Sequence, residues 1–364
     1  MTRIAIFCDG TWNSPQLKEV TNVRKLYDAL VSDPARGQIA AYFEGIGVVD
    51  KPGGWFSKKI DKYGGGAFGW GLNEKVKQAY KFIADAYKVV PEPEKIEIYL
   101  FGFSRGAYTA RSVAGMIRKC GIIEDTSEAG LDRAFELYRK TGASNAPDQP
   151  AIREARRKMS PKFATSATDL EWRGAGSHLV NIAYIGVWDT VGARGVPVAL
   201  LGPAAVFWNR QYKFHDMELS SLVQSARHAL AVDERRLFYV PAKWDNMDRL
   251  NGDKDGPFRP YQQVWFIGNH GVVGGSAKAQ PLAAIALDWV FRGAGRLTLQ
   301  QDKEIPLVKA DPLAQSSDLT VKTSPLNRWR DGPHREEDMH PSVRTRVSER
   351  PDYRPKSLWR LFRG

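Results

Sequence analysis

The segment Gly102-Phe103-Ser104-Arg105-Gly106 constrains the fold of this chain more than any other feature. It follows an apolar, β-rich run from Ile96 to Phe101 and precedes a helical pattern from Ala107 to Cys120. A Gly-x-Ser-x-Gly turn between a strand and a helix exposes its serine at a strained corner, where glycines let the two backbones approach closely. The motif predicts that Ser104 is a nucleophile. The alternative is an incidental serine in a glycine-rich turn.

Other apolar runs alternate with helical patterns along the chain. Strands are predicted at Arg3 to Cys8, Ile39 to Phe43, Ile182 to Trp188, Leu237 to Val240 and Val264 to Ile267. Helices are predicted at Leu72 to Tyr87 and Leu222 to Val232. Strands that alternate with helices indicate a parallel sheet covered on both faces. The expected class is therefore α/β. Together with the Gly-x-Ser-x-Gly turn, it predicts an α/β-hydrolase fold whose mostly parallel sheet is flanked by helices.

Composition divides the chain into a hydrolase domain over 1–300 and a basic Pro/Arg-rich tail over 301–364. Within the domain, residues 124–176 are polar and helix-prone, and we expect a helical insertion there. Residues 196–218 begin with an apolar stretch that predicts either a cap over a pocket or a buried connection. The polar, proline-rich composition of residues 316–355 predicts a largely disordered C-terminal tail.

A serine becomes a good nucleophile only when a base removes its proton and an acid orients that base. In this fold the chain order is serine, acid, histidine. His270 follows the last predicted strand, so it is expected over the carboxyl edge of the sheet as the base. His228 in the predicted helix is the alternative base, and a purely structural His270 is the other alternative.

Asp189 is the predicted orienting acid because it directly follows the strand Ile182 to Trp188. Asp245, after another predicted strand, is its rival, and acidic residues at strand ends also serve as caps or turns. For the oxyanion, the backbone N–H of Arg105 at the helix start is the first expected donor. The second is expected from Gly10 or Thr11 after the first strand, where a simple turn is an equal alternative.

Five segments together resemble a known family. They are FCDGTWN (Phe7 to Asn13), GFSRGAYTAR (Gly102 to Arg111), GVWDTVGA (Gly186 to Ala193), ALAVDERR (Ala229 to Arg236) and WFIGNHGVVGG (Trp265 to Gly275). In this order they are similar to the α/β-hydrolase domain of type VI secretion phospholipase effectors and their uncharacterised bacterial and fungal relatives. The resemblance spans about Arg3 to Phe291. It implies a triad of Ser104, Asp189 and His270, and hydrolysis of lipid esters.

One position departs from the family pattern. The family histidine is usually followed by Ser-Asp-Val-Gly-Gly, whereas His270 is followed by Gly-Val-Val-Gly-Gly, so Val272 replaces a carboxylate beside the base. The expected function is a serine hydrolase of carboxylic esters, with lipids or phospholipids as substrates. An esterase for small or polysaccharide-linked acyl groups and an inactive hydrolase-fold binding module remain the alternatives.

Charge and cysteine content indicate partners and compartment. The net charge of +12 favours anionic surfaces, and Leu358, Trp359, Leu361 and Phe362 are an expected membrane anchor at the basic C-terminal end. No nucleic-acid partner is expected, because no base-reading motif occurs. Neither a metal nor an organic cofactor is expected. Two cysteines in apolar contexts and no signal-like N-terminus predict synthesis in the cytoplasm, with any export independent of a cleaved signal.

Overall fold

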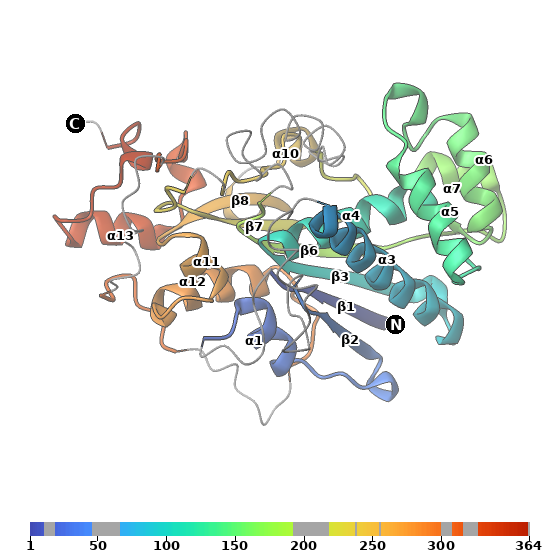
Figure 1. The fold of residues 1–364 in the computed structure, drawn as a ribbon, viewed down its shortest axis with the longest axis horizontal. Coiled ribbons are helices and arrows are strands. Elements are labelled where there is room, and N and C mark those ends of the chain that lie inside the picture. The colour runs from blue at the N-terminus through green and yellow to red at the C-terminus, as the bar shows by residue number, and fades with distance from the viewer. Residues whose placement is uncertain are drawn as a thin grey trace.

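A computed structural model of the chain describes residues 1–10, 19–45, 66–191, 218–236, 239–254, 256–299, 308–315 and 327–362. Six parallel strands form one sheet in the order β2-β1-β3-β6-β7-β8. Their bounds are β1 Thr2–Cys8, β2 Gln38–Phe43, β3 Ile96–Phe103, β6 Ile182–Trp188, β7 Ala226–Ala231 and β8 Tyr261–Phe266. The prediction of an α/β fold with a parallel sheet is confirmed (Figure 1).

Helices cover both faces of this sheet (Figure 1). One face carries α3 (Gly66–Val89) and α4 (Arg105–Cys120), and the other carries α1 (Asn22–Ala29) and α12 (Gln280–Arg292). The two layers follow from the alternation of side chains along a strand. In β1, Ile4 and Ile6 join the core under α3 and α4, whereas Ala5 and Phe7 join the core under α1 and α12.

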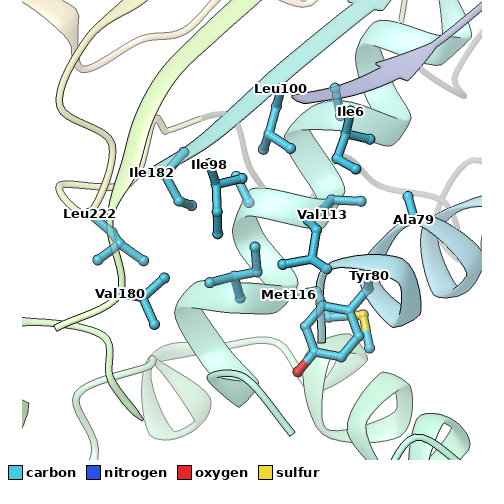
Figure 2. Packing of buried hydrophobic residues seen from close by; sticks show 14 of the residues in the cluster. Ile6, Ala79, Tyr80, Ile98, Leu100, Val113, Met116, Val180, Ile182 and Leu222 are labelled. Atoms are coloured by element: carbon cyan, nitrogen blue, oxygen red, sulfur yellow. The ribbon is translucent and has the colours of Figure 1, made fainter. Parts of the chain in front are cut away.

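The helix that follows the serine motif is anchored in the first of these cores. Figure 2 shows Val113 and Met116 of α4 among Ile98 and Leu100 of β3 and Tyr80 of α3. All five side chains are fully buried. Because α4 is held on the sheet in this way, the serine at its start has a fixed position relative to the strand ends.

The polar region at 124–176 contains three helices, α5 (Glu128–Arg139), α6 (Pro150–Met159) and α7 (Ala167–Arg173). A small parallel pair of strands flanks α7, with β4 (Phe163–Ala164) before this helix and β5 (His178–Leu179) after it. Helices α6 and α7 are joined by a buried charge cluster in which Asp169 accepts hydrogen bonds from Arg156 (3.0 Å) and Arg173 (3.1 Å). Pairing of this kind is what allows charged side chains to lie in an interior.

The predicted helix over Leu222 to Val232 is wrong. Its central residues form β7, which pairs in parallel with β6 and β8. Three alanines among six residues favour a helix by local propensity, but burial between two neighbouring strands overrides such a preference. Two short helices, α10 (Met247–Asn251) and α11 (His270–Gly274), lie before and after β8.

The prediction of a disordered tail is wrong for residues 327–355, which the structure describes as ordered. This region includes α13 (Pro341–Glu349), and His340 N–H donates to the Trp265 carbonyl of β8 at 3.0 Å. Val343 and Leu358 are buried in the core beside α12. The composition of this region is polar overall, but these two apolar side chains pack against the core of the domain. Because Leu358 is buried, it is not part of a membrane anchor.

Some predictions fall outside the described residues. Residues 192–217 contain nearly all of the predicted cap at 196–218, and Thr11 lies in the undescribed stretch 11–18. Leu237 and Phe238 are also outside, while the neighbouring Tyr239 and Val240 are not in a strand. Among the described helices, none combines the length and apolar character needed to cross a bilayer.

Candidate active site

Ser104 occupies the corner between β3 and α4. Its backbone has φ 57° and ψ −119°, and its N–H donates to the carbonyl of Trp188 at 3.0 Å. Within the described residues, Ser104 and Asp189 are the two non-glycine residues with positive φ. Such strain persists only where the surrounding structure enforces it, and it is frequent at functional sites.

The glycines of the motif allow the backbones at this corner to touch. A Cβ on Gly102 would lie 2.4 Å from the carbonyl oxygen of Gly106. A Cβ on Gly106 would lie 2.1 Å from the carbonyl oxygen of Cys8 in β1. Both distances are far shorter than a non-bonded contact, and both partners are main-chain atoms that cannot rotate away. The two glycines are therefore required by packing.

Replacing Gly106 by alanine is expected to lower the free energy of unfolding by about 2 kcal/mol or more, because α4 must move away from β1. Gly271→Ala is the matched control, since its Cβ would meet nothing closer than 3.4 Å. That variant should stay within about 1 kcal/mol of the parent. Denaturant unfolding of both proteins measures the difference, and equal stabilities would refute the close approach of α4.

A continuous hydrogen-bonded chain joins Ser104, His270 and Asp189. The distance from Ser104 Oγ to His270 Nε2 is 2.8 Å, and that from His270 Nδ1 to Asp189 Oδ2 is 2.6 Å. All three residues are buried, with Ser104 and His270 each 6% exposed. In this arrangement the serine hydroxyl can donate to Nε2 while Nδ1–H donates to the carboxylate.

The order of strands explains how residues so far apart in sequence meet. Ser104 follows β3 and Asp189 follows β6, which are neighbours, and His270 begins α11 shortly after β8. All these strands are parallel, so their carboxyl ends lie at one edge of the sheet. The structure thus brings together the three residues that the sequence placed at strand ends.

The imidazole of His270 packs against two aromatic rings, and a second carboxylate contacts the backbone of this residue. The rings of Phe103 and Tyr239 lie 4.6 and 4.7 Å from it, centroid to centroid. Glu234 accepts a hydrogen bond from the backbone N–H of His270 at 3.0 Å. Val272, where the family has a carboxylate, is fully buried in the core. Glu234 is thus a carboxylate near His270 that contacts its backbone rather than its ring.

Asp189 is a carboxylate saturated with donors. Besides His270, it accepts the N–H of Ala231 at 3.0 Å and a double hydrogen bond from the guanidinium of Arg330 at 2.6 and 2.8 Å. Burial alone would raise the pKa of Asp189, but the charge of Arg330 and the hydrogen bonds hold it well below its usual range. The group is ionised at neutral pH. The sequence offered no motif that marks Arg330, which lay in the region expected to be disordered.

The rival residues lie elsewhere. His228 is on β7, where it accepts the N–H of Thr190 at 3.1 Å and pairs with Gln263. Burial lowers the pKa of His228 to about 3, so it is a neutral structural residue. Asp245 is exposed on the surface. A further acid, Asp233, lies two residues after β7 and accepts hydrogen bonds from Gly268 N–H and the Tyr353 hydroxyl.

The expected oxyanion donors are only partly described. Arg105 is the first residue of α4, directly after Ser104. The N–H of Gly10 donates to the carboxylate of its neighbour Asp9 at 2.6 Å, and Asp9 also accepts hydroxyls from Thr21 and Tyr42. In this state Gly10 is therefore engaged in closing its own loop. Within the described ranges, no group of three acidic, histidine or cysteine side chains forms a metal site.

Comparison with known proteins identifies relatives over most of the chain. The family model described as "T6SS, Phospholipase effector Tle1-like, catalytic domain" matches residues 2–293. An uncharacterised protein of Saccharomyces cerevisiae, YEL023C, is 28% identical over 238 residues, which are 64% of this chain and 31% of the yeast protein. The chain thus spans about a third of that relative.

Two solved structures share a more distant likeness. The Tle1 effector bound to the VgrG spike of the type 6 secretion system has a TM-score of 0.40 and 19% identity, covering 76% of this chain and 51% of that one. An uncharacterised Pseudomonas aeruginosa protein has a TM-score of 0.40 and 16% identity, covering 80% and 45%. Since the family model covers residues 2–293, the chain belongs to the Tle1-like family of type VI secretion phospholipase effector catalytic domains.

Proposed function

We propose that the protein is a serine hydrolase that cleaves carboxylic esters of lipids, most specifically phospholipids. The observation that carries this proposal is the hydrogen-bonded chain from Ser104 through His270 to Asp189 at a strained strand-to-helix corner. Membership of a phospholipase effector family supports the choice of lipid esters. An inactive binding module would not require its serine to be hydrogen-bonded to a histidine and a carboxylate in this way.

The reaction follows from the geometry. Ser104 Oγ attacks the acyl carbonyl of the ester while His270 Nε2 takes the hydroxyl proton. The tetrahedral intermediate collapses when His270 returns that proton to the leaving alcohol, which gives an acyl-enzyme on Ser104. Water, deprotonated by the same nitrogen, then releases the fatty acid. Asp189 holds the ring in the tautomer with the proton on Nδ1 and stabilises the imidazolium that forms.

The negative charge of the intermediate needs two donors. The backbone N–H of Arg105 is the first, because it lies at the positive end of α4. The loop that begins at Asp9 is the source of the second. Since Gly10 N–H is bound to Asp9, its use as a donor requires that bond to exchange for one to the substrate, and Thr11 is the other residue proposed in that loop.

Contact with an anionic bilayer is part of the proposal. The net charge of +12 favours approach to phospholipid headgroups. Near the C-terminus, Trp359 (47% exposed) and Phe362 (40% exposed) accompany the basic side chains of Lys356 and Arg360. Exposed aromatic rings beside cations suit the headgroup boundary of a membrane.

A substrate panel tests the proposed class. Purified protein is incubated with p-nitrophenyl esters of two to sixteen carbons, with acetylated xylan, and with phosphatidylglycerol and phosphatidylcholine vesicles, and fatty-acid release is followed. The proposal predicts cleavage of long-chain and phospholipid esters. Cleavage of only acetyl esters or acetylated xylan would establish the small-acyl esterase instead, and no cleavage of any ester would refute a hydrolase.

The pH profile should reflect the state of His270. Burial lowers the pKa of His270 below its ordinary value, and the charge of Arg330 lowers it further, against the opposing effect of Asp189. The base must be neutral to accept a proton, so a lowered pKa preserves activity to lower pH. The acid limb of kcat/KM is expected to have its midpoint below about 6.5. A midpoint above 7 would contradict this environment for His270.

A further inference from the structure

Arg330 reaches the proposed triad from outside the matched family domain. One guanidinium nitrogen lies 2.6 Å from Asp189 Oδ1 and the other lies 2.8 Å from Oδ2, which is the oxygen that also accepts from His270. The Arg330 side chain is 5% exposed and that of Asp189 is fully buried. A double hydrogen bond between planar groups fixes both in orientation.

The backbone around the site also holds this guanidinium in place. Arg330 donates to the carbonyl oxygens of Ala231, at 3.3 Å, and of Tyr239. Ala231 is the last residue of β7, and Tyr239 lies in the chain that follows this strand and packs beside His270. The guanidinium thus bridges Asp189, the residue after β6, to the end of β7 and to the segment that follows it.

The C-terminal segment that carries Arg330 is itself docked on the domain. Arg328 N–H donates to the Arg235 carbonyl at 2.7 Å, and the ring of Trp329 lies under the Arg235 guanidinium at 5.0 Å. Further along, Ser357 Oγ donates to the Val232 carbonyl at 2.9 Å. Contacts on both sides of Arg330 therefore anchor it to the segment after β7.

The positive charge of Arg330 affects His270 because, among the described residues, few other charged groups contact this histidine. Asp189 is the negative group in contact with the ring, while Glu234 contacts the backbone of His270 and is paired with Arg236 at 2.7 Å. Tyr239 covers the ring on another side. With Arg330 removed, Asp189 would be a buried anion whose nearest compensation is protonation of His270.

We propose that Arg330 is a positioning residue, through which the C-terminal segment holds the carboxylate of Asp189 toward His270 and offsets its negative charge. This inference rests on the proposed hydrolase function. It extends the active site beyond residues 2–293, the part that matches the family. His270 must be neutral to accept the Ser104 proton. Its neutral state therefore depends on Arg330, which lies more than thirty positions beyond the matched residues.

The test compares Arg330→Met, which removes the charge, with Arg330→Lys, which keeps it. Arg344→Met is the matched control, since Arg344 is an exposed arginine of the same segment. The His270 pKa is measured by NMR titration of histidine-labelled full-length protein, and kcat/KM is measured from pH 5 to 9. Folding of each variant is checked by thermal unfolding.

Arg330→Met is expected to raise the His270 pKa by about one unit or more and to move the acid limb of kcat/KM by the same amount. At a pH below both midpoints, kcat/KM falls about tenfold for each unit by which the His270 pKa rises. Arg330→Lys should keep the pKa within about half a unit but lower kcat, since one ammonium cannot bridge both oxygens in the arginine geometry. Arg344→Met should match the parent.

Two results would overturn the inference. The first is an unshifted His270 pKa in Arg330→Met, even with reduced activity, because a merely structural role lowers activity without moving that pKa. The second is a parental kcat in Arg330→Lys. This result decides the question if Arg330→Met fails to fold. The NMR titration needs no turnover, so an inactive parent protein would refute the hydrolase while the titration still tests the coupling of Arg330 to His270.

Discussion

Replacing Ser104 by alanine is expected to lower kcat/KM for ester cleavage by about 10,000-fold or more while the fold remains intact. Ser104 Oγ is the atom that lies 2.8 Å from His270 Nε2, so the variant loses the nucleophile itself. Removal of one member of such a triad has effects of about this size, and the remaining members cannot compensate. Alanine keeps the Cβ at this corner, so the backbone strain is unchanged and the melting temperature should move little.

The matched control is Ser112→Ala, a buried serine of the same helix. It should retain parental kcat/KM. Each variant is assayed with the best substrate of the ester panel at saturating and limiting concentrations. Substantial turnover by Ser104→Ala, above the level of a contaminating esterase, would mean that another nucleophile performs the reaction.

Asp189→Asn is expected to be nearly as damaging, with kcat lower by about 10,000-fold. The NH2 group of asparagine cannot accept a hydrogen bond, so it must face either His270 Nδ1 or the donors from Arg330 and Ala231. When it faces His270 it donates to Nδ1, so the ring carries its proton on Nε2 and cannot accept from Ser104. The substitution also leaves the guanidinium of Arg330 buried without its anion. Breaking one partner of a buried ion pair costs about 3–5 kcal/mol, so stability should fall as well.

The control for this variant is Asp245→Asn, the acid that the sequence left as the rival. Asp245 is exposed and has no described contact with His270, so neither activity nor stability should change. Denaturant unfolding and steady-state kinetics are measured on both proteins. An active Asp189→Asn enzyme would contradict the assignment of Asp189, and an inactive Asp245→Asn enzyme would point to Asp245 as the orienting acid.

The sequence predicted the sheet and the meeting of the three residues because both depend on local signals. Arg3 to Cys8 and Ile96 to Phe101 are short apolar runs bounded by turn residues, and both are strands, with β3 extending to Phe103. Once parallel strands are inferred, residues that follow them must share one edge. This rule placed Asp189 and His270 near Ser104, and the chain order and the family resemblance favoured them over rivals such as Asp245.

The failures came from interactions between distant parts of the chain. β7 has the sequence ARHALA, and only its neighbours β6 and β8 decide that it is extended. In the tail, composition indicated disorder, but Val343 and Leu358 occupy places in a core built by other elements. Arg330 was missed for the same reason. Its role depends on where the segment docks, which no local pattern in the sequence encodes.

The most direct test of the central claim is covalent labelling of the native protein with a fluorophosphonate, followed by mass spectrometry of the intact protein and its peptides. The account predicts one adduct per chain, on Ser104, because a serine polarised by His270 reacts with this class of probe. Labelling should disappear in Ser104→Ala. An unlabelled parent protein, or an adduct on another serine, would contradict the assignment of Ser104 as the nucleophile.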